Sequence, residues 1–166
     1  MQFQASLLPA SLPDAGHVEL NARYRPAPEG IDIGGDWYDA FERPDGSVRI
    51  SSAGHLPPRR VGRGSASLLT GCVDPPLRLG VPGRRSYAAQ LAVGETIVLY
   101  TDGPIERRRG PLDRSLDRLV HAGQALGPRV RQANEIVARL MDDFAHDAKD
   151  DVAILAATLA ERCVER

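Results

Sequence analysis

The stretch VGETIVLYTDG, residues 93–103, gives the clearest structural signal in this chain of 166 residues. Val93, Gly94 and Glu95 have the character of a turn, and the run from Thr96 to Tyr100 is apolar or β-branched. Asp102 and Gly103 then end the run. A short apolar run bounded by turn residues is typical of a buried β-strand. We therefore expect a strand at residues 96–100, with a carboxylate at the point where it leaves the core.

The C-terminal third shows a second strand of this kind and two helices. The segment DDVAILAATLA, residues 150–160, is an apolar strand introduced by two aspartates. Residues 131–146 place apolar side chains at a period of about 3.6, which is the strongest helical signal in the sequence. Residues 112–125 show a weaker pattern of the same type. We expect two helices followed by a closing strand.

The N-terminal part is dominated by strand signals. HVELNARYR, residues 17–25, alternates apolar and polar side chains and predicts a half-buried strand. Pro44-Asp45-Gly46 is a strong turn signal. Other strand candidates are residues 31–41, residues 48–52 and short pieces within 56–94. Strands first, helices late and one closing strand favour an α+β fold, with helices packed on an antiparallel sheet or sandwich. The length suits one domain over residues 1–166.

Composition excludes several classes of function. A formal net charge of −1 gives no general attraction to nucleic acid or to an anionic membrane. Cys72 and Cys163 are far apart in sequence and lack zinc-type spacing, which fits a reducing cytosol rather than a disulfide framework. The sequence shows neither a signal-peptide pattern nor an apolar run long enough for a transmembrane helix. We expect a cytoplasmic protein that binds neither nucleic acid nor membranes.

Carboxylates stand at the edges of the strand candidates in three places. Asp36 follows two glycines, Asp102 precedes Gly103, and Asp150 and Asp151 open the last strand. Carboxylates brought close together repel one another, so converging strand ends would favour a hard, oxygen-liganded cation such as Mg²⁺ or Mn²⁺. Each aspartate taken alone also fits a simple turn or cap, so this pattern leaves both interpretations open.

Longer motifs carry a family resemblance. The segment SLLPASLPDAGHVELNARYRPAPEGIDIGGDWYDAF and then SSAGHLPP, PPLRLGV, LAVGETIVLYTDGPIERR and KDDVAIL resemble, in this order, bacterial SpoIIE/RsbU-type phosphatase domains. These domains belong to the metal-dependent protein phosphatase (PPM) family. The resemblance covers nearly the whole chain and implies a β-sandwich of antiparallel sheets with flanking helices. It also implies two Mg²⁺ or Mn²⁺ ions that activate a bridging water to attack phosphoserine or phosphothreonine.

The resemblance assigns roles to the strand-edge aspartates. Asp36 corresponds to an acidic, catalytic residue of the site, and the implied metal ligands are Asp36, Asp102 and Asp150, with Asp151 ranked second to Asp150. The implied substrate is a phosphorylated anti-sigma-factor antagonist with a STAS domain, in partner-switching control of stress response or sporulation. His55 of SSAGH fits either a phosphate contact or a structural loop residue, and the substrate-binding residues are not identified.

One family segment does not occur in this sequence. A Gly-Asp-x-x-Gly-His-Gly-type segment normally follows GGDWYD, and it includes the aspartate that bridges both metals in the family. Here Ile50 leads directly into Ser51 and the SSAGH motif, as in a domain truncated by an internal deletion near residues 50–51. We therefore expect weak or absent phosphatase activity and one weak metal site or none. Asp32, Asp39 or Glu106 would be the nearest substitute ligands, on proximity alone.

This departure leaves two alternatives to an active enzyme. One is a non-catalytic pseudophosphatase that binds a regulatory partner, and the other is a deletion product without a selected role. Loss of the helices in the missing segment would expose one face of a sheet. We therefore also expect a homodimer or a partner chain that covers this face.

Overall fold

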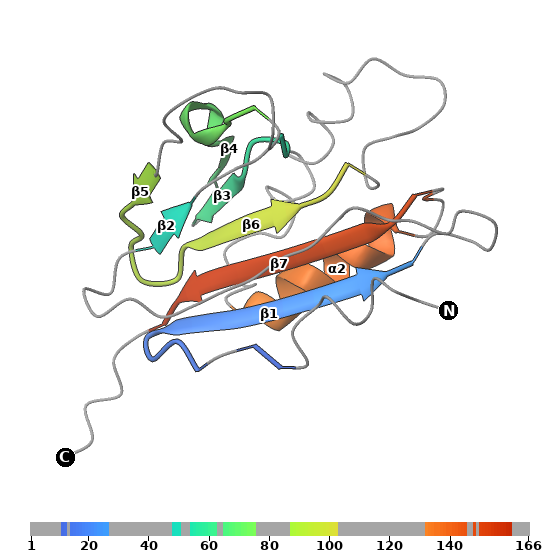
Figure 1. Ribbon diagram of the computed structural model, residues 1–166. Helices are drawn as coiled ribbons and strands as arrows, with labels where there is room; N and C mark the ends of the chain where they lie inside the picture. The colour runs from blue at the N-terminus through green and yellow to red at the C-terminus, as the bar shows by residue number, and fades with distance from the viewer. Residues whose placement is uncertain are drawn as a thin grey trace.

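The computed structural model describes residues 11–12, 14–26, 48–50, 54–62, 65–75, 87–102, 132–145, 148 and 150–160. Within these residues the chain forms a five-stranded sheet in the order β1-β7-β6-β3-β4, a separate pair β2-β5 and the helix α2 (Figure 1). All strand pairs are antiparallel. The elements are β1 (Val18–Arg25), β2 (Val48–Ile50), β3 (Arg59–Gly62), β4 (Ser65–Leu68), η2 (Thr70–Cys72), β5 (Tyr87–Ala89), β6 (Thr96–Tyr100), α2 (Ala133–Phe144) and β7 (Val152–Leu159). This architecture confirms the predicted α+β class.

Strand β6 lies where the sequence predicts it. The preceding turn is closed by a hydrogen bond of 2.9 Å from the Glu95 N–H to the Ala92 carbonyl. Gly94 adopts φ +81°, a left-handed conformation that favours glycine. Val98 of β6 belongs to the main core cluster, whereas its neighbour Ile97 packs with Ile50 and Ala89 in a second cluster. The strand is therefore buried on both faces, which explains its continuous apolar run.

Strand β7 lies between β1 and β6 and is the most buried strand of the sheet. Its residues from Val152 to Thr158 are all buried, with exposed fractions of at most 6%. The register places Val152 opposite Arg25 of β1 and Ile154 opposite Tyr100 of β6. The predicted closing strand is thus confirmed, and its two introductory aspartates lie just outside the sheet.

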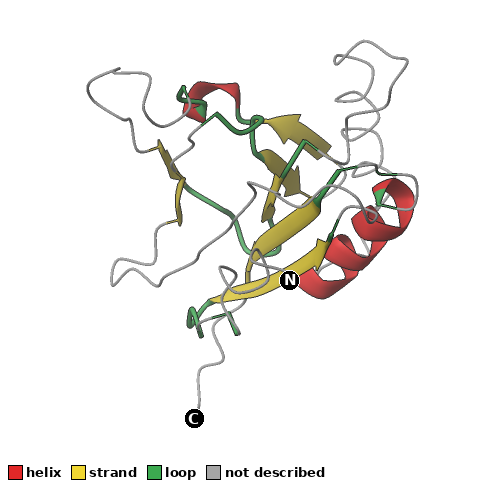
Figure 2. Ribbon diagram, turned by 45° about the vertical axis from the view of Figure 1, so that its right-hand side comes forward, coloured by secondary structure: helices red, strands yellow, loops and turns green. Residues whose placement is uncertain are grey.

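Helix α2 covers one face of β7 and β1, as Figures 1 and 2 both show. The predicted helix at 131–146 is confirmed over residues 133–144. Its buried side chains recur every three or four residues: Ala133, Ile136, Val137, Leu140 and Phe144. The opposite side carries Arg139, whose Nε donates to an Asp143 carboxylate oxygen at 3.4 Å. The amphipathic pattern therefore fixes which side of the helix meets the sheet.

The remaining sequence predictions divide into two groups. The half-buried strand predicted at 17–25 is confirmed as β1, and the strand predicted at 48–52 is confirmed over β2. The predictions for residues 31–41, 44–46 and 112–125 lie outside the described residues. No helix in the described part of the chain is long and apolar enough to cross a membrane.

Candidate metal-binding edge

The end of β6 and the start of β7 lie side by side at one edge of the sheet (Figure 1). The two strands are antiparallel, and the pairing continues one step beyond β6, where the Thr101 N–H donates to the Ala153 carbonyl at 3.1 Å. Asp102 directly follows Thr101 in the sequence, and Asp150 and Asp151 directly precede β7. The structure therefore brings Asp102 to the same edge as Asp150 and Asp151. Asp36, the third predicted position, lies outside the described residues.

The Thr101 hydroxyl joins the two strands at this edge. It accepts a hydrogen bond of 3.0 Å from the Ala153 N–H and donates one of 3.2 Å to the Asp151 carbonyl. Thr101 is 5% exposed. Both bonds are thus shielded from water, and each satisfies a backbone group at the start of β7.

The three described aspartates differ in exposure. Asp102 is exposed and Asp150 is partly exposed, whereas Asp151 is buried and only 4% exposed. One carboxylate oxygen of Asp150 accepts a hydrogen bond of 2.8 Å from the Asp151 N–H. Solvent and solutes therefore reach Asp102 and Asp150 more readily than Asp151.

The donor chemistry of this edge fits a hard cation in part. Carboxylate oxygens are the ligands that Mg²⁺ and Mn²⁺ prefer, and Asp102 and Asp150 supply them from neighbouring strand ends. Within the described part of the chain, no group of three or more His, Cys, Asp or Glu side chains is arranged to hold a metal ion. Asp102 and Asp150 would supply only part of a ligand set, and their role as ligands stays a prediction. The predicted third ligand, Asp36, and the substitutes Asp32, Asp39 and Glu106 all lie outside the described residues.

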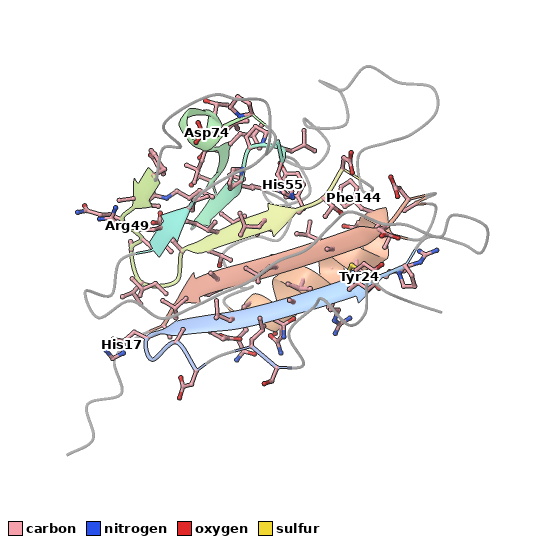
Figure 3. All side chains as sticks on the ribbon, viewed as in Figure 1. His17, Tyr24, Arg49, His55, Asp74 and Phe144 are labelled. Atoms are coloured by element: carbon pink, nitrogen blue, oxygen red, sulfur yellow. The ribbon has the colours of Figure 1, made fainter. Side chains whose placement is uncertain are left out.

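The loop that carries His55 is tied to the end of β6. The Tyr100 hydroxyl donates to the Pro57 carbonyl at 2.7 Å, and the Gly54 N–H donates to the Asp74 carbonyl at 2.8 Å. His55 is partly buried between these two anchor points, and Figure 3 draws it toward the same end of β6. The sequence analysis missed this connection. Its only signal is a tyrosine at the end of a buried strand, where the hydroxyl needs a partner.

Tyr100 also neighbours a buried arginine that the sequence analysis missed. Arg59 of β3 is 0% exposed. Burial lowers its pKa to about 10, and a smaller electrostatic effect of Tyr100 raises the pKa. Burial raises the pKa of Tyr100 to about 12, and the positive charge of Arg59 opposes this rise. At neutral pH the guanidinium is therefore charged and the phenol neutral. The neighbouring Arg60 instead pairs with Glu95 near the surface.

Comparison with known proteins agrees with this fold. The family model described as Stage II sporulation protein E (SpoIIE) matches residues 37–160, a range that contains Asp102, Asp150 and Asp151 and begins just after Asp36. The structure of the RsbU and RsbW domains of Rv1364c from Mycobacterium tuberculosis is 28% identical over 69% of this chain and 33% of that one, with a TM-score of 0.51. A search of curated proteins found no significant match.

A second structure shows the same fold at lower identity. It is the PP2C phosphatase domain with a fragment of the regulatory domain of SpoIIE from Bacillus subtilis, 17% identical over 72% of this chain and 35% of that one, with a TM-score of 0.55. The chain spans about a third of each of the two matched structures. The family match over most of the sequence and the shared fold lead to one conclusion: this chain belongs to the SpoIIE/RsbU-type family of PPM phosphatase domains.

Proposed function

We propose that this chain, as one domain over residues 1–166, recognises a phosphorylated STAS-domain anti-sigma-factor antagonist in the cytoplasm. In this proposal the domain hydrolyses the phosphoserine or phosphothreonine weakly or not at all. The observation that carries the proposal is the acidic edge, where Asp102 follows the end of β6 and Asp150 precedes the adjacent start of β7. The setting would be partner-switching control of a sigma factor, as the family resemblance implies.

The acidic edge would supply the metal ligands. Asp102 and Asp150 would hold a Mg²⁺ or Mn²⁺ ion together with Asp36, the predicted catalytic aspartate. By the family resemblance Asp151 ranks second to Asp150, and its side chain is buried. When bound, such ions make a coordinated water more acidic and neutralise charge on phosphoryl oxygens. Arg25, which pairs with Val152 in register, brings positive charge to the same edge, where it favours a phosphorylated ligand.

The expected weakness of catalysis rests on the sequence. No Gly-Asp-x-x-Gly-His-Gly occurs in the 166 residues, so the aspartate that bridges both ions in the family has no counterpart. Loss of a ligand shared by two ions impairs the paired geometry more than the loss of a terminal ligand would. A single weak ion site is therefore the most that we propose, and a homodimer or partner over an uncovered sheet face remains part of the proposal.

A calorimetric Mn²⁺ titration combined with a hydrolysis assay tests the proposal. We expect weak Mn²⁺ binding, loss of this binding in Asp102→Asn, and little or no Mn²⁺-dependent hydrolysis of a phosphoserine protein or p-nitrophenyl phosphate. Asp14→Asn is the matched control, because Asp14 is exposed and precedes the start of β1, which pairs with the end of β7 farthest from Asp150. Fast Mn²⁺-stimulated turnover that Asp102→Asn abolishes would refute impaired catalysis. Absence of Mn²⁺ binding at millimolar concentration would refute the metal site.

The second candidate is a binding module without turnover, which the missing bridging aspartate favours. It requires the chain to bind a phosphorylated STAS-domain protein tightly and to leave the phosphate in place. Equal affinity for the phosphorylated and the unphosphorylated protein would show that the binding module does not recognise the phosphate. If the chain binds neither form and no metal, the result supports a deletion product without a selected role.

A further inference from the structure

We propose that Thr101 is a positioning residue for the acidic edge, whose hydroxyl sets the placement of Asp102 relative to Asp150. The inference rests on the proposed metal site and assigns a role to a residue that is not itself a ligand. Thr101 is buried, directly precedes Asp102, and donates a hydrogen bond to the carbonyl of Asp151, the neighbour of Asp150. It is also the last residue of the β6 segment bonded to β7.

The hydrogen bonds of Thr101 depart from a regular antiparallel pair. Residues that face each other in such a pair exchange two backbone bonds at every second position, and a bond from one of the two N–H groups marks Thr101 and Ala153 as such a position. The Thr101 N–H does donate to the Ala153 carbonyl at 3.1 Å, but the Ala153 N–H donates to the Thr101 side-chain oxygen at 3.0 Å. The hydroxyl thus takes the place of the Thr101 carbonyl as acceptor. This exchange lets the backbone turn away from β7 at the residue that precedes Asp102.

The second hydrogen bond of the Thr101 hydroxyl connects it to Asp151 and, through Asp151, to Asp150. The hydroxyl donates to the Asp151 carbonyl at 3.2 Å, and the N–H of Asp151 donates to a carboxylate oxygen of Asp150 at 2.8 Å. One hydroxyl therefore connects the backbone that presents Asp102 with the residue that orients the Asp150 carboxylate. Because it both donates and accepts within the protein, it is suited to hold the ligands in place rather than to bind the ion.

The same two strands contain a matched control at their opposite end. The hydroxyls of Thr96 and Thr158 lie 2.8 Å apart, and the two residues are 1% and 2% exposed. These residues face each other across β6 and β7 in register. Loss of the Thr96 hydroxyl therefore removes a buried bond between the same strands without changing the acidic edge.

The test compares Thr101→Val, Thr101→Ser and Thr96→Val in the full chain. Mn²⁺ affinity is measured by calorimetry, and amide hydrogen exchange of Ala153 is measured relative to that of Leu155 in the middle of β7. We expect Thr101→Val to weaken Mn²⁺ binding by about tenfold or more, the range found for residues that orient metal ligands. We also expect it to speed exchange at Ala153 selectively. Thr101→Ser keeps the hydroxyl and should restore both properties, and Thr96→Val should retain both.

The outcomes separate this inference from the proposed function. If the wild type binds Mn²⁺ and Asp102→Asn abolishes binding, but Thr101→Val binds as the wild type does, the positioning role is refuted and the metal site stands. Equal loss of affinity in Thr101→Val and Thr96→Val also refutes it, because general destabilisation then explains both. If the wild type binds no Mn²⁺, the proposed metal site fails and the positioning role fails with it.

Discussion

The pair formed by Thr96 and Thr158 allows a quantitative test of the sheet. Their hydroxyl oxygens lie 2.8 Å apart, and each residue is almost completely buried. Valine has nearly the same shape as threonine and a similar preference for strands, so Thr→Val removes the hydroxyl without a large change in packing. The two single substitutions and the double substitution therefore isolate the hydrogen bond.

The expected energies are not additive. Thr96→Val leaves the Thr158 hydroxyl buried without its partner, which costs about 1–3 kcal/mol, and Thr158→Val has the same effect in reverse. The double substitution removes both polar groups and should be nearly neutral. Against a total stability of about 5–15 kcal/mol, each single loss is large enough to measure.

Urea unfolding followed by circular dichroism measures the effect. With a slope of about 1–3 kcal/mol/M, a loss of about 2 kcal/mol lowers the midpoint by about 1 M, whereas the double variant should unfold close to the wild type. Single losses below about 0.5 kcal/mol, or a double variant whose loss equals the sum of the singles, would contradict a buried hydroxyl pair between β6 and β7.

Three further predictions follow from the core, from a surface ion pair and from the His55 loop. Leu140→Ala should lower the free energy of unfolding by about 2–5 kcal/mol because Leu140 is 1% exposed. Arg139 is exposed, so Arg139→Ala should change this free energy by about 0.5 kcal/mol or less. Equal effects of the two substitutions in urea unfolding would contradict the orientation of α2. Partial burial raises the pKa of Glu95, but hydrogen bonds from Arg60 and a backbone N–H outweigh this effect and leave the pKa below its usual value. Such a carboxylate stabilises the fold above its ordinary pKa, and this stabilisation disappears as the pH falls through the folded pKa. Glu95→Gln should therefore lower the free energy of unfolding by about 0.2–1 kcal/mol at neutral pH and by less in acid. A larger decrease in acid than at neutral pH would refute the pairing. Tyr100→Phe should cost about 0.5–1.5 kcal/mol through its bond to the loop carbonyl, and an unchanged unfolding midpoint would exclude that bond.

The elements that the sequence predicts correctly are those with a local pattern. The strand at 96–100 and the helix at 131–146 each follow from the spacing of neighbouring apolar residues, which depends only on strand or helix geometry. The expectation that strand ends with aspartates lie together agrees with the register of β6 and β7, whereas the roles of Asp102 and Asp150 as metal ligands stay a prediction. The expected place of Asp36 in this group stays a prediction, since it lies outside the described residues.

The contacts that no local pattern reveals join residues far apart in the chain. The Thr101 hydroxyl bonds to residues about 50 positions away, and the Tyr100 hydroxyl bonds to Pro57, 43 positions away. Arg59 and Arg60 have the same side chain in adjacent positions, yet only Arg59 is buried, because side chains alternate between the two faces of β3. Which of the two arginines faces the core depends on the pairing of β3 with β6 and β4, not on its own neighbours in sequence.

The core of the described part of the chain is formed mainly by elements that follow β2 in the sequence. The main core cluster draws on β3, β6, α2 and β7. Strand β1 pairs with β7 along its full length. The antiparallel pairing of β6 with β7 by itself brings Asp102 and Asp150 to one edge. The sheet and the placement of Asp102 and Asp150 at one of its ends therefore follow from the pairing of β1, β7 and β6.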